Sequence, residues 1–175
     1  MVSYIFKINQ FLNRSEEAVE LATVIKSLGQ IKEVSSEEFI IHFFESLNMQ
    51  NKAIIKIDLS LARFHNLKVL NLSFNKIQKL EFIPPNLEEL YVNGNAINEI
   101  GINQNKPLVN LIHLGISMNQ IRQPALTQIV KVFPNLFCLD ISYNDLCDMN
   151  LTLVWLMQLS KLRMLSLEGN PLVLT

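Results

Sequence analysis

Cys138, Asp140 and His113 are the residues of this chain whose types and spacing could carry out covalent chemistry. Residues 136 to 146 read LFCLDISYNDL, which places a thiol, a carboxylate, a hydroxyl and a phenol within six positions. An imidazole can stabilise a thiolate, and a nearby carboxylate can orient the imidazole, so these three groups could form a cysteine nucleophile. Whether His113 lies beside Cys138 depends on the elements that carry the two residues.

The second half of the chain repeats one pattern five times. Each copy reads L-x-x-L-x-(L/I/V)-x-x-N-x-(L/I), and the first leucines stand at 67, 87, 111, 136 and 162, with spacings of 20, 24, 25 and 26. Repetition at this period predicts a solenoid, in which each repeat forms one coil and the coils stack. The five copies are residues 67–77, 87–97, 111–121, 136–146 and 162–172.

Alternation within the repeat predicts which side chains are buried, because a strand points successive residues to opposite faces. The expected core pairs are Leu70/Leu72, Leu90/Val92, Leu114/Ile116, Leu139/Ile141 and Leu165/Leu167. An asparagine follows each pair where the chain leaves the strand, and its amide can bond backbone groups that water cannot reach. These predicted structural asparagines are Asn75, Asn95, Asn119, Asn144 and Asn170.

Equivalent positions of successive coils become lateral neighbours in a parallel sheet, about 4.8 Å apart. His113 should therefore lie beside Cys138. Catalysis would also require oxyanion donors and a pocket, whereas strand amides are used by the sheet and this face is open. We therefore predict a non-enzymatic, partner-binding concave face: Asn71, Ser73, Glu89, Tyr91, Asn93, His113, Ser117, Met118, Cys138, Asp140, Ser142, Tyr143, Met164 and Glu168.

The acidic bias of this set favours a protein partner with a basic helix or tail. A net charge of -1 disfavours direct nucleic-acid binding. No signal peptide, membrane-spanning run, phosphate-binding glycine loop or zinc-ligand spacing is recognisable, so we predict no cofactor, metal, membrane or small-molecule substrate. Two irregularly placed cysteines suggest a reducing, cytoplasmic setting.

The segments between repeats predict how the opposite, convex side is built. Pro84 and Pro85 exclude a regular helix from the short 77–87 spacer, which should be extended or a brief turn. Residues 124–133 open with a proline suited to a first helical turn, and 151–162 are apolar enough to pack on the sheet. The convex side should become more helical toward the C-terminus.

Upstream of the repeats the pattern changes to a helical period. Ser15 begins one amphipathic segment, and a capping box of Ser35 with Glu38 begins a second that runs through Phe39 to Leu47. We predict a helical N-terminal cap over residues 1–52 and an α/β solenoid over 53–175. Residues 53–64 should form a degenerate first strand. The apolar sequence at 172–175 suggests an uncapped end, as in a fragment or isoform of a longer chain, or an end against which something docks.

The repeats resemble the leucine-rich repeat superfamily over residues 54–175. SSEEFIIHFFESL, IPPNLEELYVNGNAI and LRMLSLEGNPLVL carry a closer resemblance, over 35–174, to the family of leucine-rich repeat-containing protein 43. That resemblance implies a longer, non-enzymatic, intracellular scaffold of tissues with motile cilia, in the cytoplasm or the axoneme. Regulation of a phosphatase and an adaptor role in a ribonucleoprotein remain open as alternatives.

Overall fold

The computed structural model describes residues 42, 44–101 and 107–173 of the chain. Two compact units are distinguished, Met1–Phe44 and Glu45–Thr175. The predicted cap helices fall almost entirely outside the described residues. The second unit contains all five repeats and is the part described below.

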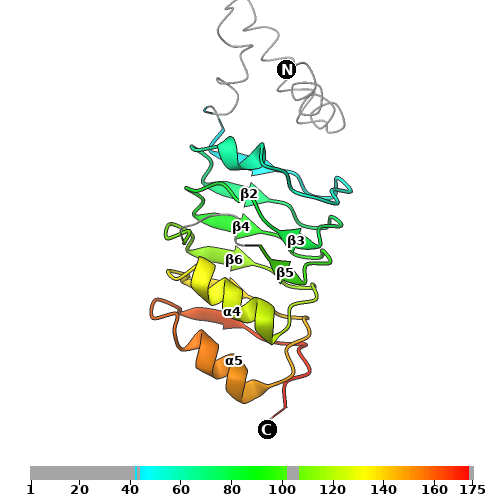
Figure 1. The fold of residues 1–175 in the computed structure, drawn as a ribbon, viewed down its shortest axis with the longest axis vertical. Helices are drawn as coiled ribbons and strands as arrows, with labels where there is room; N and C mark the ends of the chain where they lie inside the picture. The colour runs from blue at the N-terminus through cyan, green and yellow to red at the C-terminus, as the bar shows by residue number, and fades with distance from the viewer. Residues whose placement is uncertain (1–41, 43, 102–106, 174–175) are drawn as a thin grey trace, which may run out of the picture. The chain divides into compact units, whose positions relative to one another are not determined.

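Six short parallel strands form the main sheet of the second unit, one strand for each coil (Figure 1). They are β1 (Ser46–Asn48), β2 (Val69–Asn71), β4 (Glu89–Tyr91), β6 (His113–Gly115), β7 (Cys138–Asp140) and β8 (Met164–Ser166), hydrogen-bonded in that order. Equivalent repeat positions are paired throughout, as Leu114 with Leu90 and Leu139 shows. The fold is a leucine-rich repeat solenoid with a parallel sheet.

The core lies between the main sheet and the convex side. In the first four repeats the fourth and sixth positions, including Leu70, Leu90, Leu114 and Leu139, are completely or almost completely buried. Phe133 packs into the same core from the end of the first helical spacer. Burial of each large apolar side chain contributes about 1.5–3 kcal/mol, so the repeated leucines dominate the stability of the unit.

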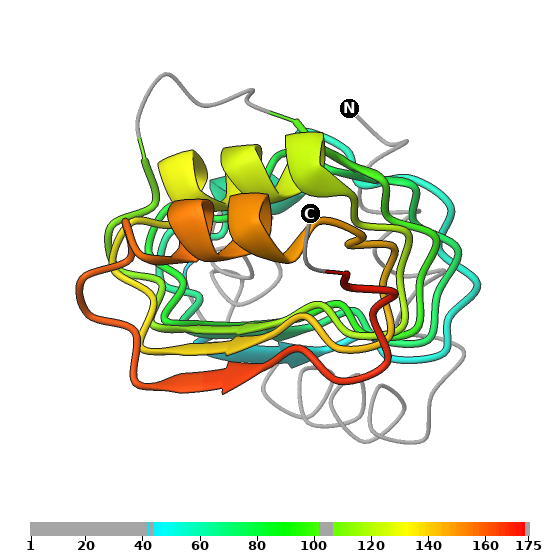
Figure 2. The same ribbon diagram turned by 90° about the horizontal axis from the view of Figure 1, so that it is seen from below.

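The convex side changes along the solenoid as the spacer sequences predict. The short, proline-containing spacer holds β3 (Lys79–Leu80), which pairs in parallel with β5 (Glu99–Ile100) of the next coil. The two longer spacers hold α4 (Gln123–Val132) and α5 (Met149–Leu156). Figure 2 shows both helices on the side of the coils opposite the main sheet.

The two helices begin differently. Pro124 lies in the first turn of α4, where its missing N–H is not needed. Asp148 caps α5, because its Oδ1 accepts a hydrogen bond from the Leu151 N–H at 2.8 Å. The C-terminal ends of both helices lead into loops on one side of the coils, and these loops enter the strands of the main sheet (Figure 2).

The first strand lies earlier than the sequence predicted. β1 spans Ser46–Asn48, whereas residues 53–64 form a segment without regular secondary structure, a turn and the 3-10 helix η1 (Leu61–Arg63). Leu47, predicted on a helix, is paired with Leu70 in the sheet. The pattern L-x-M-x-x-K-x-I over 47–54 places Lys52 at the asparagine position, so the repeat was missed.

The last coil also differs from the prediction of a uniformly buried core. Leu139 is 1% exposed, but the equivalent Leu165 in β8 is 42% exposed, and Leu167 is only half-buried. A solenoid leucine is covered by the coil on each side, and among the described residues β8 has a neighbouring strand, β7, on one side only. Periodicity predicted the inward direction of Leu165 without its degree of burial.

Candidate functional site

The outer face of the main sheet, here called the concave face, gathers the third, fifth, seventh and eighth positions of every coil. Register places His113 between Glu89 and Cys138, and Gly115 between Tyr91 and Asp140. The predicted neighbours His113 and Cys138 are therefore brought together. These side chains come from segments about 25 residues apart, and the ladder of strand hydrogen bonds fixes their order.

A row of asparagine side chains fixes the loops that follow the strands. The Asn144 Nδ2 atom donates to the carbonyls of Ile116, Ile141 and Ser142 at 3.0–3.1 Å, and its Oδ1 accepts from the Ile121 N–H at 2.9 Å. One amide thus links its own coil to the preceding one. Asn75, Asn95, Asn119 and Asn170 make the corresponding bonds in their coils.

Each carboxylate of the concave face accepts a hydrogen bond from a hydroxyl of the chain itself. The Tyr91 hydroxyl donates to Glu89 Oε2 at 2.8 Å, and the Ser142 hydroxyl donates to Asp140 Oδ1 at 2.6 Å. The Tyr143 hydroxyl donates to Glu168 Oε1, across two neighbouring coils. Hydrogen bonds of this kind hold the carboxylates in one orientation before any ligand arrives.

These contacts raise the pKa values of the two tyrosine hydroxyls. Partial burial and the hydrogen bond to Glu89 raise the pKa of Tyr91 to about 12. The hydrogen bond to Glu168 is the main cause of the raised pKa of Tyr143. Both phenols therefore remain neutral donors at physiological pH, and the negative charge of the face resides on the carboxylates.

Tyr91 and His113 pack together in the middle of the face. Their ring centroids are 4.9 Å apart and the rings are tilted by 51°. Gly115 permits this arrangement, because a Cβ at that position would lie 3.1 Å from the Tyr91 ring and from the Asn93 side chain. The result is a fixed aromatic surface between Glu89 and Asp140.

Exposed apolar side chains border the face at the eighth repeat position. Phe74, Met118 and Tyr143 adopt left-handed backbone conformations with φ between 51° and 56°, and about half of each side chain is exposed. The other two repeats have Gly94 and Gly169 at this position, and the Phe74 and Tyr143 rings cover them. The face therefore has both charged and apolar contact groups.

Three predicted contact residues are less accessible than expected. Ser73, Ser117 and Ser142 are buried, and the N–H of each donates a hydrogen bond to a side chain of the face. They position Asn71, Asn93 and Asp140 through backbone and hydroxyl hydrogen bonds. Among the remaining predicted contact residues, Met118, Tyr143, Met164 and Glu168 are exposed, and the others are half-buried.

The Cys138 site lacks the features of an activated nucleophile. Partial burial and the Asp140 charge raise the pKa of the Cys138 thiol, which disfavours the thiolate that would attack a substrate. The strand N–H groups on either side are used by the sheet, so they cannot stabilise an oxyanion. Among the described residues, no group of three His, Cys, Asp or Glu side chains is arranged to hold a metal ion.

A second row of asparagines precedes the strands and was not predicted. Asn86 Nδ2 donates to the His65 carbonyl at 2.8 Å, and Asn135 Nδ2 donates to the Val109 carbonyl at 2.8 Å. Asn110 Nδ2 donates a hydrogen bond to Asn86 Oδ1 at 3.4 Å. The signal was an asparagine directly before the first leucine in four of the five repeats, at Asn66, Asn86, Asn110 and Asn135.

Comparison with known proteins agrees with this geometry. A leucine-rich repeat family model matches residues 65–79. Leucine-rich repeat-containing protein 43 of Homo sapiens is 34% identical over 143 residues, covering 79% of this chain and 22% of the human protein. The protein of that name from Mus musculus is 34% identical over 142 residues, covering 79% of this chain and 21% of the mouse protein.

Another curated relative is serine/threonine-protein kinase 11-interacting protein of Gallus gallus, 34% identical over 73% of this chain and 12% of that protein. The chain spans less than a quarter of the length of these three relatives. Among solved structures, the leucine-rich repeat ectodomain of the receptor kinase SOBIR1 from Arabidopsis thaliana is 20% identical, with a TM-score of 0.49. That match covers 71% of this chain and 68% of the ectodomain.

No helix within the described residues is long and apolar enough to cross a membrane. The resemblance to leucine-rich repeat-containing protein 43 that the sequence suggested is supported by the matched identity over most of the chain. The repeated pattern, the single strand per coil and the matched repeat model together identify the chain as a member of the leucine-rich repeat superfamily.

Proposed function

We propose that the chain is a non-enzymatic interaction scaffold whose concave face binds a basic segment of a partner protein. The observation that carries this proposal is the set of three carboxylates, Glu89, Asp140 and Glu168, each held by a hydroxyl of the chain. None of the third, fifth, seventh and eighth positions in the described coils is a lysine or an arginine. A partner with positive charge would meet attraction without a competing internal cation.

The concave face also offers apolar contacts to the partner. Tyr91 and Met164 lie among the carboxylates, and Phe74, Met118 and Tyr143 border them. Aromatic and methionine side chains are enriched at the cores of protein interfaces. The segment that fits best is therefore a helix or an extended tail with Lys or Arg and a few apolar residues.

The relatives support an interaction role in general terms. One of them is named for its interaction with a serine/threonine kinase. From the family resemblance that the sequence suggested, we also propose a place in cilium-related assembly, in the cytoplasm or the axoneme. This assignment rests on the resemblance, whereas the charge of the partner is argued from the concave face.

Charge reversal on the concave face tests the proposal. Glu89→Lys with Asp140→Lys should reduce capture of the partner from a ciliated-cell lysate by at least about tenfold, because two attractive contacts become repulsive. The matched control is Glu99→Lys with Asp145→Lys, which makes the same change in net charge away from this face. Equal capture by both variants and the native chain would place the interface elsewhere.

A further inference from the structure

A second surface lies on the edge of the sheet where the chain enters the strands. Its apolar members are Val109, Ile112 and Phe137, which are 52%, 46% and 48% exposed. Its cationic members are Lys131, Lys161 and Arg163, all exposed. These six residues are called the strand-entry patch below, and they share no member with the concave face.

Backbone hydrogen bonds fix the apolar centre of the strand-entry patch. The Phe137 N–H donates to the Ile112 carbonyl at 2.8 Å, and the Arg163 N–H donates to the Phe137 carbonyl at 2.9 Å. Ile112, Phe137 and Arg163 therefore occupy the same repeat position in three consecutive coils. Val109 is held near this row, because its carbonyl accepts a hydrogen bond from the Nδ2 atom of Asn135, which is two residues before Phe137 in the sequence.

The position that Ile112 and Phe137 occupy is charged in the preceding coils. Lys68 and Glu88 stand there and form an ion pair, with Lys68 Nζ 2.6 Å from Glu88 Oε1. The edge thus changes from a self-neutralised pair to two exposed apolar side chains. An exposed phenylalanine is not required by the core, since Phe133 and Leu136 already fill it in this coil. Clustered exposed apolar residues mark interaction surfaces.

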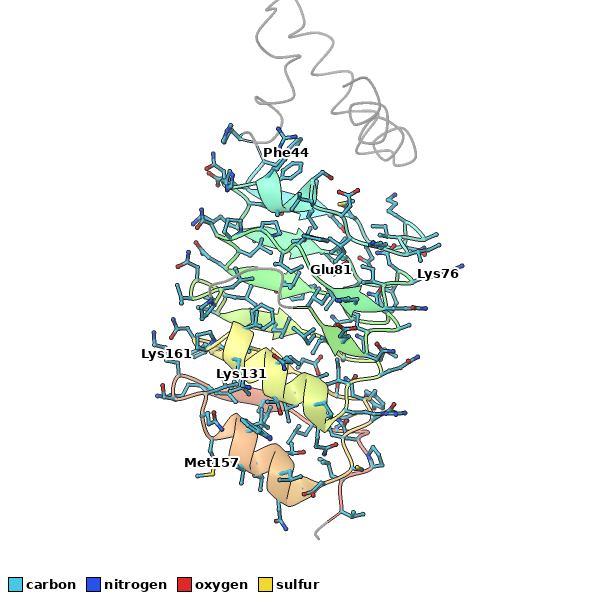
Figure 3. The ribbon with its side chains drawn as sticks, viewed as in Figure 1. Phe44, Lys76, Glu81, Lys131, Met157 and Lys161 are labelled. Carbon is cyan, nitrogen blue, oxygen red and sulfur yellow. The ribbon has the colours of Figure 1, made fainter. Side chains whose placement is uncertain are left out.

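Positive charge surrounds the apolar centre. Figure 3 shows Lys131 at the end of α4 and Lys161 in the loop before β8, both on the side where the chain enters the strands. A backbone hydrogen bond joins the end of α4, near Lys131, to the segment that contains Val109: the Leu108 N–H donates to the Val132 carbonyl at 2.7 Å. No aspartate or glutamate occurs between Glu99 and Asp140 in the sequence, so the stretch that carries Ile112, Lys131 and Phe137 contains no carboxylate side chain.

We infer that the strand-entry patch binds a short acidic peptide segment with aromatic or branched aliphatic anchors, in a partner protein. Ile112 and Phe137 accept the anchors, and Lys131, Lys161 and Arg163 attract the carboxylates. The sign of the charge is opposite to that of the concave face, so one basic segment could not satisfy both surfaces. The chain would then connect two different ligands, one on each surface.

Peptide display tests this inference without a known partner. Random short peptides displayed on phage are first depleted on Lys161→Glu with Arg163→Glu, which no longer attracts carboxylates, and then selected on the native chain. Peptides rich in Asp or Glu with Phe, Leu, Ile or Trp are expected. No enrichment after depletion, or enrichment of basic or uncharged peptides, would overturn the inference.

A fluorescence titration of the enriched peptide supplies the second measurement. Lys161→Glu with Arg163→Glu should weaken binding by about tenfold or more, and Ile112→Ser with Phe137→Ser should do the same without adding charge. Glu89→Lys with Asp140→Lys should leave this affinity unchanged, which separates the inference from the concave-face proposal. All substituted residues are exposed or half-buried, and circular dichroism verifies the fold. Equal affinity for all variants would contradict the assignment.

Discussion

The buried and exposed halves of each repeat follow different rules. The fourth position is leucine in all five repeats, whereas the third position is Val69, Glu89, His113, Cys138 and Met164 in turn. The buried side chain meets a coil on each side, so one shape fits everywhere and a change would leave a cavity. The exposed position meets solvent, so its chemistry can differ from coil to coil. The interior therefore builds the solenoid, and the concave face is the part whose chemistry can vary from coil to coil.

The largest expected effect is a cavity in the middle of the solenoid. Leu139→Ala should lower the free energy of unfolding by about 3 kcal/mol, because a 1% exposed leucine leaves unfilled volume between two coils. Leu165→Ala is the matched control at the same repeat position. It should cost about 1 kcal/mol or less, because Leu165 is already 42% exposed. Urea unfolding followed by circular dichroism measures both, and equal losses would contradict the account of the last coil.

The next effect is the loss of a buried amide. Asn144→Ala should lower the free energy of unfolding by about 2 kcal/mol, because the Ile121 N–H and the Ile116 carbonyl lose their partner away from water. Asn98→Ala, at an exposed position, is the control and should change stability by less than about 0.5 kcal/mol. The same unfolding measurement applies. A negligible loss at Asn144 would mean that water replaces the amide.

A smaller effect is expected at Tyr91 on the concave face, whose hydroxyl donates a hydrogen bond to Glu89. The folded pKa of Tyr91, about 12, lies above its ordinary value of 10.0, so folding favours the neutral phenol. The resulting stability is fully present below pH 10.0 and is lost as the pH rises through about 12. Stability of the native chain should therefore fall more steeply than that of Tyr91→Phe over this range. Unfolding curves at several alkaline pH values check the slopes, and parallel slopes would argue against the raised pKa of Tyr91.

The smallest effect concerns the two thiols. Cys138 is half-buried and its pKa is raised, whereas Cys147 is exposed. Iodoacetamide should therefore modify Cys147 first, because alkylation requires an accessible thiolate. Mass spectrometry of the digested protein gives both rates. Faster reaction at Cys138 would revive the interpretation of this residue as a nucleophile.

Periodicity explains how much of this structure could be predicted. The strands, the inward leucines and the asparagine positions follow from a repeat seen five times, and a proline in the first turn indicated the helix of residues 123–132. The first strand was missed because Lys52 replaces the asparagine, and the exposure of Leu165 depends on neighbouring coils. On the face, Glu89 and Tyr91 are two residues apart on one strand and could have been paired. The Tyr143–Glu168 contact crosses coils and required the structure.

The strand-entry patch was missed for a different reason. Ile112 and Phe137 stand at a repeat position that alternation assigns to neither the core nor the concave face. They can be recognised as part of a surface only when the exposure of their side chains is known, together with the positions of Lys161 and Arg163. Sequence periodicity identifies the positions that must be buried between stacked coils. It says little about exposed positions that become neighbours only because their coils are adjacent.

Photo-crosslinking tests the central claim, that the concave face carries recognition, most directly. A benzophenone amino acid replaces His113 in one sample and Gln78, an exposed residue away from the main sheet, in another. After illumination with the lysate, mass spectrometry identifies the joined peptides. We predict an adduct from position 113 to a Lys- or Arg-rich peptide and none from position 78. An adduct from position 78 without one from position 113, or an acidic peptide at 113, would contradict the account.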